Sequence, residues 1–294
     1  MTAQRYVVGY TATESGDDAV ALAARLARAS GAELDIVMVL PEEGRGAVVP
    51  PDAGYETFLR GRAEGWLAAG AAKVPQGVPR RVYVRFAESF AEGLVTIAAE
   101  LGASHIVVGA AGGSRRGRYG LGSVASELLH SSDVPVVLAP SGSAAVTEPV
   151  TRVTAAIGTR PGADALLDEA VALAAVTGAG LRLVSLVTVD LPASVDTGVI
   201  RIAGAAHAGD VLDEAKAALP DAAVAEAIVA RGDSIEDAVS HLDWLPGEVV
   251  LVGSSRLAQP RRLFLGSTAS KMLRELPVPM IVVPRTRAQE EGQR

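Results

Sequence analysis

The chain has 294 residues, of which 49% are hydrophobic, 21% are charged and 4% are aromatic, and this composition excludes a largely disordered protein. It contains no cysteine, which excludes disulfide bonds, thiolate catalysis and cysteine-based zinc sites. The formal net charge of −7 argues against a general nucleic-acid-binding protein, which would normally be basic.

The N-terminal segment turns polar within a few residues, so it resembles neither a signal peptide nor a transit peptide. No stretch reaches the roughly 18 uninterrupted apolar residues of a membrane span. We therefore expect a cytoplasmic protein that does not bind membranes.

The first half of the chain alternates between strand and helix patterns. Apolar residues at positions 19, 22, 23 and 26 have the spacing of one helix face, and Gly31 is expected to end that helix. We predict strands at 6–8, 34–40, 82–86, 105–109 and 134–138, with helices around 19–30, 56–72 and 94–101 and a further helix that begins at Ser123. Such alternation predicts a parallel sheet with helices on both faces, whose ligands lie beyond the carboxyl ends of the strands.

The second half of the chain repeats the first. Gly109 and Gly253 each end an apolar run and lie 144 positions apart, as do the dipeptides Gly122-Ser123 and Gly266-Ser267. Near the start of each unit the similar segments 16–19 and 162–165 lie 146 positions apart. One structural unit is therefore expected to occur twice.

The predicted fold is α/β, with two tandem doubly wound five-stranded parallel sheets of Rossmann-like type, each in strand order 3-2-1-4-5. The segment 141–149 is small and polar and ends in proline, which is typical of a linker. We expect a first domain at 1–142, a linker at 143–149, a second domain at 150–288 and a tail at 289–294.

A glycine-rich loop follows the strand at 105–109. Its spacing is G-x2-G-x9-G-S, formed by Gly109, Gly112, Gly122 and Ser123. Glycine lets the backbone approach a ligand without a Cβ in the way, and a helix start favours an anion through its free N–H groups and its dipole. The arrangement suits a polyphosphate, although the same glycines also fit a purely structural turn.

This loop, the strand at 134–138 and the opening sequence VVGYTAT are similar to the universal stress protein family, whose nucleotide-binding members carry G-x2-G-x9-G-[S/T] at this place. The resemblance covers both units and implies a fold like that of the adenine nucleotide α hydrolases, with ATP as the ligand and Mg²⁺ as a companion of its phosphates. The nucleotide-binding residues that it implies are Thr11, Thr13, Val39, Val108, Gly109, Gly112, Gly113, Gly122, Ser123 and Val124. Of these, Val39 would help to form the adenine pocket.

The first unit departs from the family pattern at Thr11, where ATP-binding members usually have an aspartate. A hydroxyl group can bond a ribose or a metal-bound water, but it lacks the carboxylate charge. Weaker or altered nucleotide or metal binding is therefore one expectation. A second is that Thr11 and Thr13 only cap the first helix.

The second unit departs further from the pattern. It keeps Gly253, Gly266 and Ser267, followed by Thr268, but Arg256 replaces the middle glycine. The aspartate position of this unit is assigned to the apolar residue Ile157. We expect an empty or degenerate second site, in which Arg256 either fills the space or contacts a phosphate.

Catalytic and metal-binding patterns are weak. Ser123, His130 and Asp133 are triad residue types, but His130 lies seven residues along the same predicted helix, roughly 10 Å away, and no G-x-S-x-G motif is present. A Walker loop ending in GK[ST] is also missing, as is a G-x-G-x-x-G motif after the first strand. His207 and Asp210 fit a surface pair better than a metal site.

Two functions stay open. One is a non-enzymatic stress or signalling protein in which bound ATP shifts a conformational equilibrium. The other is a protein-interaction module of the same fold that binds no nucleotide. An electron-transfer or adenylating enzyme is disfavoured, because the sequence shows no matching extension or catalytic motif. The family resemblance implies that the two units pair through their fifth strands as an intramolecular pseudo-dimer, and it leaves a homodimer of two chains open.

Overall fold

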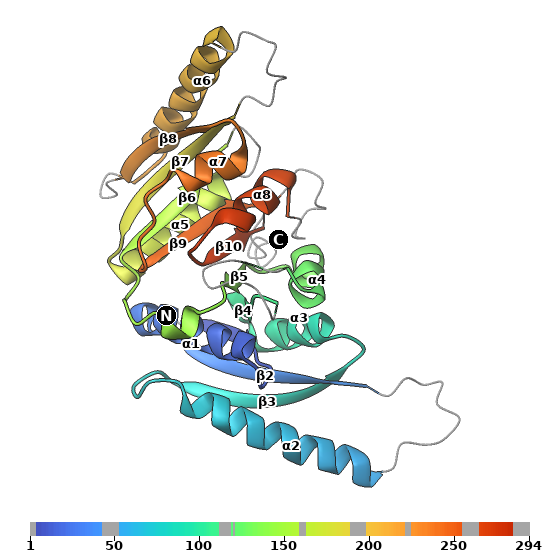
Figure 1. Cartoon of the computed structure of the whole chain (residues 1–294). Coiled ribbons are helices and arrows are strands. Elements are labelled where there is room, and N and C mark those ends of the chain that lie inside the picture. The colour runs from blue at the N-terminus through green and yellow to red at the C-terminus, as the bar shows by residue number, and fades with distance from the viewer. Residues whose placement is uncertain are drawn as a thin grey trace, which may run out of the picture.

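The structure of the chain is a computed structural model. It describes residues 4–42, 53–111, 119, 121–158, 163–188, 198–220, 225–254 and 265–284. Strands and helices alternate along both halves of the chain, and the helices lie on both faces of one wide, twisted sheet (Figure 1).

The first half contains five strands and four α-helices in its described residues. They are β1 (Arg5–Gly9), α1 (Glu14–Ser30), β2 (Glu33–Pro41), α2 (Ala53–Ala72), β3 (Arg80–Ala87), α3 (Phe90–Leu101), β4 (His105–Gly109), α4 (Ser123–Ser131) and β5 (Val136–Ala139). Thr13 caps the start of α1, and Gly31 ends this helix in the left-handed conformation, as predicted.

The second half repeats this series after a short 3₁₀ turn, η1 (Ser143–Ala145), that lies within the predicted linker. Its elements are β6 (Arg152–Ala156), α5 (Ala163–Thr177), β7 (Gly180–Thr188), α6 (Gly198–Ala217), β8 (Ala225–Gly232), α7 (Ile235–Ser240), β9 (Glu248–Gly253), α8 (Ser267–Glu275) and β10 (Met280–Val283). None of the helices in the described parts of the chain is long and apolar enough to cross a membrane.

The strands follow the order β3-β2-β1-β4-β5-β10-β9-β6-β7-β8. Each half therefore has the predicted order 3-2-1-4-5. Within each half the strands are parallel, as predicted, and the two halves merge into one mixed sheet because the fifth strands, β5 and β10, pair in antiparallel fashion, with Val137 opposite Ile281. Both strands are fully buried, and pairing covers the two edges that would otherwise carry free backbone groups.

The register of the strands corrects the alignment of the two units. Tyr6 lies opposite His105 in the first unit, and Val153 lies opposite Val249 in the second. Since β4 and β9 lie 144 positions apart, Tyr6 and Val153 are counterparts, which is a separation of 147 positions and not 146. Accordingly, the amides of Tyr10 and Ile157 donate to the carbonyl oxygens of Val37 and Val184, each at 2.8 Å. Ile157 is the counterpart of Tyr10, so its assignment to the aspartate position is wrong. Gly158 is the counterpart of Thr11.

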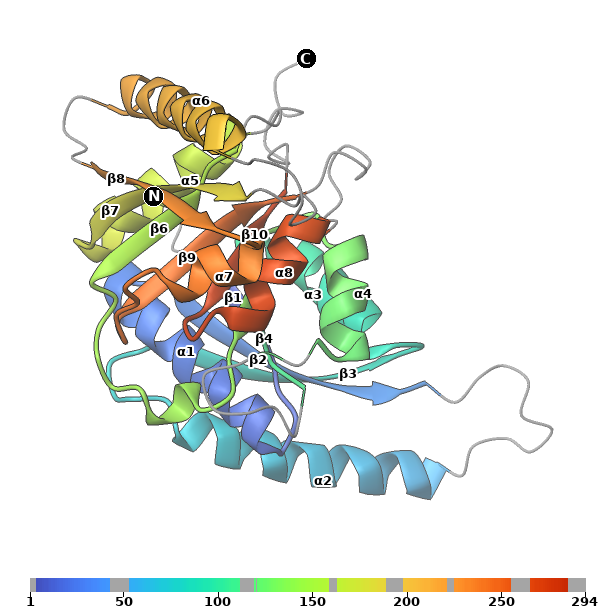
Figure 2. The same ribbon diagram turned by 45° about the horizontal axis from the view of Figure 1, so that its top comes forward.

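Two large apolar clusters cover the two faces of the sheet. One lies under α1, α2, α5 and α6 and runs across both halves of the chain. The other lies under α3, α4, α7 and α8 (Figure 2). This double layer leaves the carboxyl ends of the parallel strands as the place where a ligand can reach the backbone.

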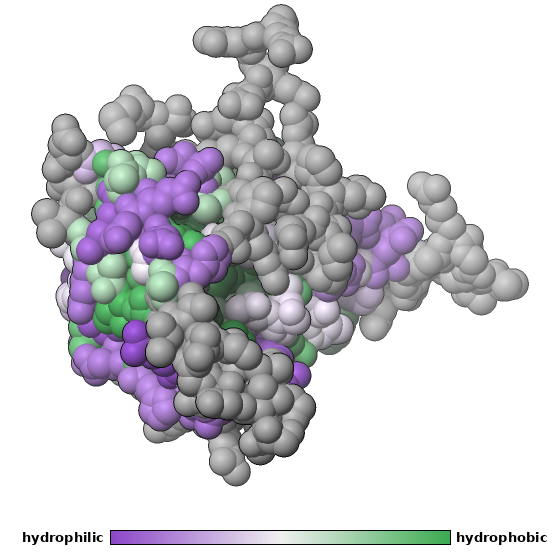
Figure 3. All heavy atoms as spheres, turned by 90° about the horizontal axis from the view of Figure 1, so that it is seen from above, coloured by the Kyte–Doolittle hydropathy of each residue, from purple (hydrophilic) through white to green (hydrophobic). Residues whose placement is uncertain are grey.

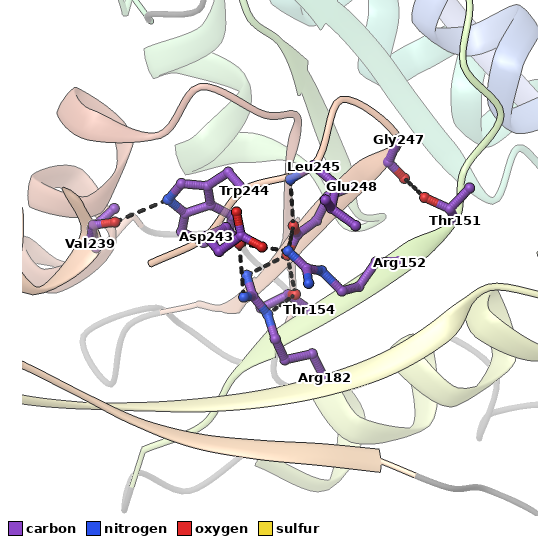
Figure 4. Close-up of polar contacts among 10 residues, drawn as sticks. All are labelled: Thr151, Arg152, Thr154, Arg182, Val239, Asp243, Trp244, Leu245, Gly247 and Glu248. Atoms are coloured by element: carbon purple, nitrogen blue, oxygen red, sulfur yellow. Dashed lines mark hydrogen bonds and ion pairs between the residues drawn. The ribbon is translucent and has the colours of Figure 1, made fainter. Parts of the chain in front are cut away.

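A buried ionic cluster lies at the amino ends of β6, β7 and β9, which is the opposite end from the carboxyl edge (Figure 4). Glu248 is fully buried and accepts hydrogen bonds from Arg182 at 2.5 Å, from Arg152 at 2.6 Å and from the hydroxyl of Thr154. The guanidinium of Arg182 also lies 4.9 Å from the ring centre of Trp244. The cluster ties three strands together, away from any candidate ligand site.

Candidate functional site

The first candidate site lies where β1 and β4 end and α4 begins. The described residues there enclose a small cleft of about 140 Å³. Six of the predicted nucleotide-binding residues line it, namely Thr11, Val108, Gly109, Gly122, Ser123 and Val124. Gly112 and Gly113, which were also predicted, lie outside the described residues.

Gly109 allows the start of α1 to pack closely against the end of β4. A Cβ at this position would lie 2.0 Å from the carbonyl oxygen of Ser15, in the first turn of α1. Gly122 has more space, because a Cβ there would come no closer than 3.2 Å, to Ala111. The glycine pattern thus serves two purposes, since one glycine accepts a neighbouring helix and the other borders the cleft.

Thr13 takes the role of a helix cap. Its hydroxyl accepts a hydrogen bond from the amide of Gly16 at 3.5 Å, and it lies 2.8 Å from the hydroxyl of Thr11. Thr11 itself is exposed and lines the cleft. The two hydroxyls therefore have different roles: Thr13 caps α1, and Thr11 lines the cleft.

Val39, predicted to help form an adenine pocket, is buried against α3. A Cβ at Gly93 would lie 2.7 Å from a methyl group of Val39, so the helix and the strand are in close contact here. Phe90 fills the neighbouring space, with its ring 3.1 Å from the position of a Cβ at Gly9. These contacts explain why little open space remains in the first domain.

The start of α4 offers backbone donors next to the cleft. Gly122 is its N-cap residue and provides no capping side chain. The first amides of the helix are therefore available to an anion, and the helix dipole favours negative charge there. The start of α8 is equivalent, with Gly266 as N-cap residue and no capping side chain.

The second candidate site is the equivalent position in the second domain, and it is larger. It is a cavity of about 440 Å³ between the carboxyl ends of β6, β7 and β9 and the helices α5, α6 and α8. Gly253, Gly266 and Thr268 of the predicted residues line it, whereas Arg256 lies outside the described residues. Ser267, also predicted, is exposed at the start of α8. At this end of the molecule, hydrophobic residues form a recessed area bordered by hydrophilic ones (Figure 3).

The volume difference has a cause in the side chains. Ile235 lines the second cavity at the position that Phe90 occupies in the first domain, one residue after the N-cap serine of the equivalent helix. Gly253 is also less crowded than Gly109, since the nearest described atom to an added Cβ is the Cδ2 of Leu166 at 3.9 Å. Known ligand pockets occupy about 300–1,000 Å³, a range that includes the second cavity and excludes the first.

Sequence reasoning ranked the two sites by their glycines and expected the second to be degenerate. The replacement of Phe90 by Ile235 and of Tyr10 by Ile157 is the signal that would have indicated the larger space. That signal depends on the correct register, which the sequence repeat alone placed one residue away.

The catalytic triad interpretation finds no support in the geometry. His130 is on α4, where its Nδ1 lies 2.5 Å from the carbonyl oxygen of Ser126 in the same helix. Within the residues that the structure describes, no group of three or more His, Asp or Glu side chains could hold a metal ion. Thr11 and Gly158 are counterparts in the two domains, and neither residue carries a carboxylate.

Comparison with known proteins gives a consistent picture. The model of the universal stress protein family matches residues 2–140 and 149–284. Universal stress proteins of Mycobacterium tuberculosis and Mycobacterium bovis are 29% identical over 297 residues, covering 95% of this chain and 99% of theirs. The crystal structure of a universal stress protein from Archaeoglobus fulgidus is similar with a TM-score of 0.70 and 20% identity, covering 97% of this chain and all of the other.

Proposed function

The chain belongs to the universal stress protein family, with two family domains in tandem, and on this premise we propose that it binds an adenine-type nucleotide, ATP, without catalysing a reaction on it. The observation that carries the proposal is the 440 Å³ cavity at the carboxyl edge of β6, β7 and β9, beside the uncapped start of α8. An apolar cavity next to free helix amides suits a ligand with a flat base and an anionic tail.

The proposal assigns a role to each group in the second cavity. The amides at the start of α8 and the hydroxyl of Thr268 would contact phosphate. Gly253 would let the backbone of β9 approach the sugar or phosphate without obstruction. The apolar wall formed by Leu186 and Met272 would face the base.

The first-domain cleft is proposed as a weaker site. It keeps the complete glycine spacing, Thr11, Ser123 and the uncapped start of α4, but its described part has about a third of the space. We therefore expect the order of affinity to be the reverse of the order that the glycine pattern suggests.

The described groups around the clefts support a ligand role without catalysis. Among the described lining residues, His207 is the one side chain of an acid–base type, and it is exposed on α6. Bound ATP would stabilise the conformation that it prefers by RT ln(1 + [ATP]/Kd), which makes the nucleotide a conformational effector. Mg²⁺ would accompany the phosphates and add positive charge to them.

The test is a calorimetric titration of ATP into the full chain and two variants, Gly253→Val and Gly122→Val. We expect the tighter binding event to disappear in Gly253→Val and the weaker one in Gly122→Val, because each side chain enters its own cleft. Thermal unfolding without ligand checks that both variants are folded. If the wild-type chain binds no ATP, and the denatured purified protein releases no adenine nucleotide, the proposal fails and an interaction module remains.

A further inference from the structure

One side of the second-domain cavity is formed by residues on the face of the sheet that α5 and α6 cover, together with residues of these two helices. This part, here called the α5–α6 chamber, is lined by Ile157, Leu166, Ser185, His207, Ala208 and Val211. It lies on the face of the sheet that α1 and α2 cover in the first domain. The phosphate-side groups of the proposed nucleotide site lie on other elements, β9 and α8.

The corresponding space in the first domain is filled by protein. Tyr10, the counterpart of Ile157, is 2% exposed, and its ring lies 2.7–3.0 Å from the position of a Cβ at Gly70 on α2. Met38, the counterpart of Ser185, is 5% exposed and belongs to the same cluster. An aromatic ring and a long apolar side chain thus occupy in the first domain what the second domain leaves open.

The helices that close this space also differ between the domains. In α2, Ala63 and Leu67 are fully buried, as are Ala208 and Leu212 at the same places in α6, 145 positions later. The same separation pairs Lys73 with an alanine at position 218. Lys73 forms an ion pair with Asp17 of α1 at 2.5 Å, which links the two helices of the first domain. An alanine cannot form such a link, so this particular contact has no equivalent at position 218.

The chamber is lined by one hydroxyl, that of Ser185. Ser185 is 5% exposed, and within the described part of the chain its side chain makes no hydrogen bond. The hydroxyl therefore faces the cavity with its hydrogen-bonding capacity unused by protein. A ligand atom that donates to or accepts from Ser185 would form a hydrogen bond there.

We propose that the α5–α6 chamber is a binding compartment for a neutral heteroaromatic ring, which takes the place of the Tyr10 ring and hydrogen-bonds to Ser185. The chemistry of the lining disfavours a charged group deep in the chamber, because its buried side chains are apolar except for the hydroxyl of Ser185, and His207 is exposed on α6. The compartment does not depend on phosphate binding. The ring belongs either to the base of a nucleotide or to a separate small molecule.

The test uses indole and indene, two flat molecules of the same shape that differ in one N–H group. Binding to the full chain is measured by calorimetry and by the methyl NMR signals of Ile157 and Val211. For the wild-type chain we expect indole to bind roughly tenfold more tightly than indene, because it gains one hydrogen bond. In Ser185→Ala the two affinities should become equal.

A double variant, Ile157→Tyr with Ser185→Met, installs the side chains of the first domain and should abolish binding of both molecules. Ile157→Leu, which keeps the volume and the apolar character, should retain both affinities within a few fold. Equal affinity of the wild-type chain for indole and indene would overturn the proposal. So would undetectable binding of both, or binding that survives in the double variant.

An ATP titration of the same double variant identifies the source of the ring. Loss of ATP affinity assigns the chamber to the base of the nucleotide, and unchanged ATP affinity assigns it to a separate ligand. Indole binding to a chain that fails to bind ATP would support the chamber and contradict only the proposed function, so the two failures are distinguishable.

Discussion

Gly109 and Gly253 occupy the same position in the two domains but have different surroundings. A Cβ at Gly109 would lie 2.0 Å from the backbone oxygen of Ser15, while at Gly253 the nearest described atom is 3.9 Å away. We expect Gly109→Ala to lower the free energy of unfolding by about 1–3 kcal/mol, because backbone must move. Gly253→Ala should stay within about 0.5 kcal/mol. Chemical denaturation compares them, and equal losses would contradict the close packing of α1 on β4.

Arg182 is one of two guanidinium partners of the buried Glu248. It is 1% exposed and donates to Glu248 and to Thr154. Removing one partner of a buried ion pair typically costs about 3–5 kcal/mol, and because Arg152 still pairs with Glu248, Arg182→Met should lower the free energy of unfolding by about 3 kcal/mol, the lower end of that range. Arg231→Met, at an exposed position of β8, is the matched control and should have little effect. A loss as small as that of the control would show that Arg152 alone satisfies the carboxylate.

The sequence indicates which residue types form the candidate sites, but it does not indicate what each one faces. The spacing of Gly109 and Gly122 could be read directly, whereas the contact of Gly109 with Ser15 depends on how α1 packs across the sheet. Ser185 carries no motif and stands in an apolar strand, so its role appears only when the counterpart side chain, Met38, is known. The surroundings of Gly109 and of Ser185 depend on tertiary packing, which local sequence patterns do not reveal.

At the scale of elements, the helices α3 and α7 begin with the same reciprocal cap. Ser89 accepts from the amide of Glu92, whose carboxylate accepts from the amide of Glu88. Ser234 and Asp237 repeat this arrangement in the second domain, with distances of 3.1 and 3.0 Å. Each cap satisfies one amide of the first helical turn and the amide of the residue before the N-cap.

We expect Ser89→Ala and Ser234→Ala each to lower the free energy of unfolding by about 1 kcal/mol. In Ser234→Ala the loss of hydrogen-exchange protection should be concentrated more in the capped helix itself, because α7 has only six residues and depends more on its cap. Hydrogen exchange of the amides in each helix measures this directly. Ser→Thr variants at both positions keep the hydroxyl and serve as controls, and similar loss of protection in them would contradict a capping role.

The order of elements was readable because each strand and helix has its own apolar period, and the strand order of each half follows the prediction. The register between the repeats was not readable, because the segments near the starts of the two units look most similar when shifted by one residue. Backbone pairing resolves the shift, since a one-residue slip would turn every buried side chain of β6 to the other face.

At the scale of the whole molecule, the two halves are held together by more than the pairing of β5 with β10. His105 of the first half and Glu169 of the second lie 3.2 Å apart with little exposure. The carboxylate of Asp18 on α1 accepts hydrogen bonds from the amides of Gly142 and Ala144 at the start of the second half's connection. Strand pairing, the contact between His105 and Glu169 and a tied connection together make the ten-stranded sheet one unit.

Tyr119 adds a further tie at this seam, and it belongs to the glycine-rich loop of the first domain. Its hydroxyl is shared between the carbonyl oxygen of Leu138 at 3.0 Å and that of Val278 at 2.7 Å, one from each half. Burial raises the pKa of the Tyr119 phenol well above its ordinary value. The folded state therefore keeps this proton at a pH where the unfolded chain loses it.

This raised pKa gives a prediction with a definite sign. The contribution of Tyr119 to stability is fully present below the ordinary tyrosine pKa of about 10 and is lost as the pH rises above it, towards the folded-state value. Tyr119→Phe should cost about 1 kcal/mol at pH 8 through the lost hydrogen bond, and it should lose less stability between pH 9 and 11 than the wild-type chain. Part of the alkaline loss remains in the variant, because burial also raises the pKa values of Tyr6 and Tyr10. Denaturation series at several pH values measure both effects, and parallel curves for the two proteins above pH 9 would show that the Tyr119 hydroxyl is not buried at the seam.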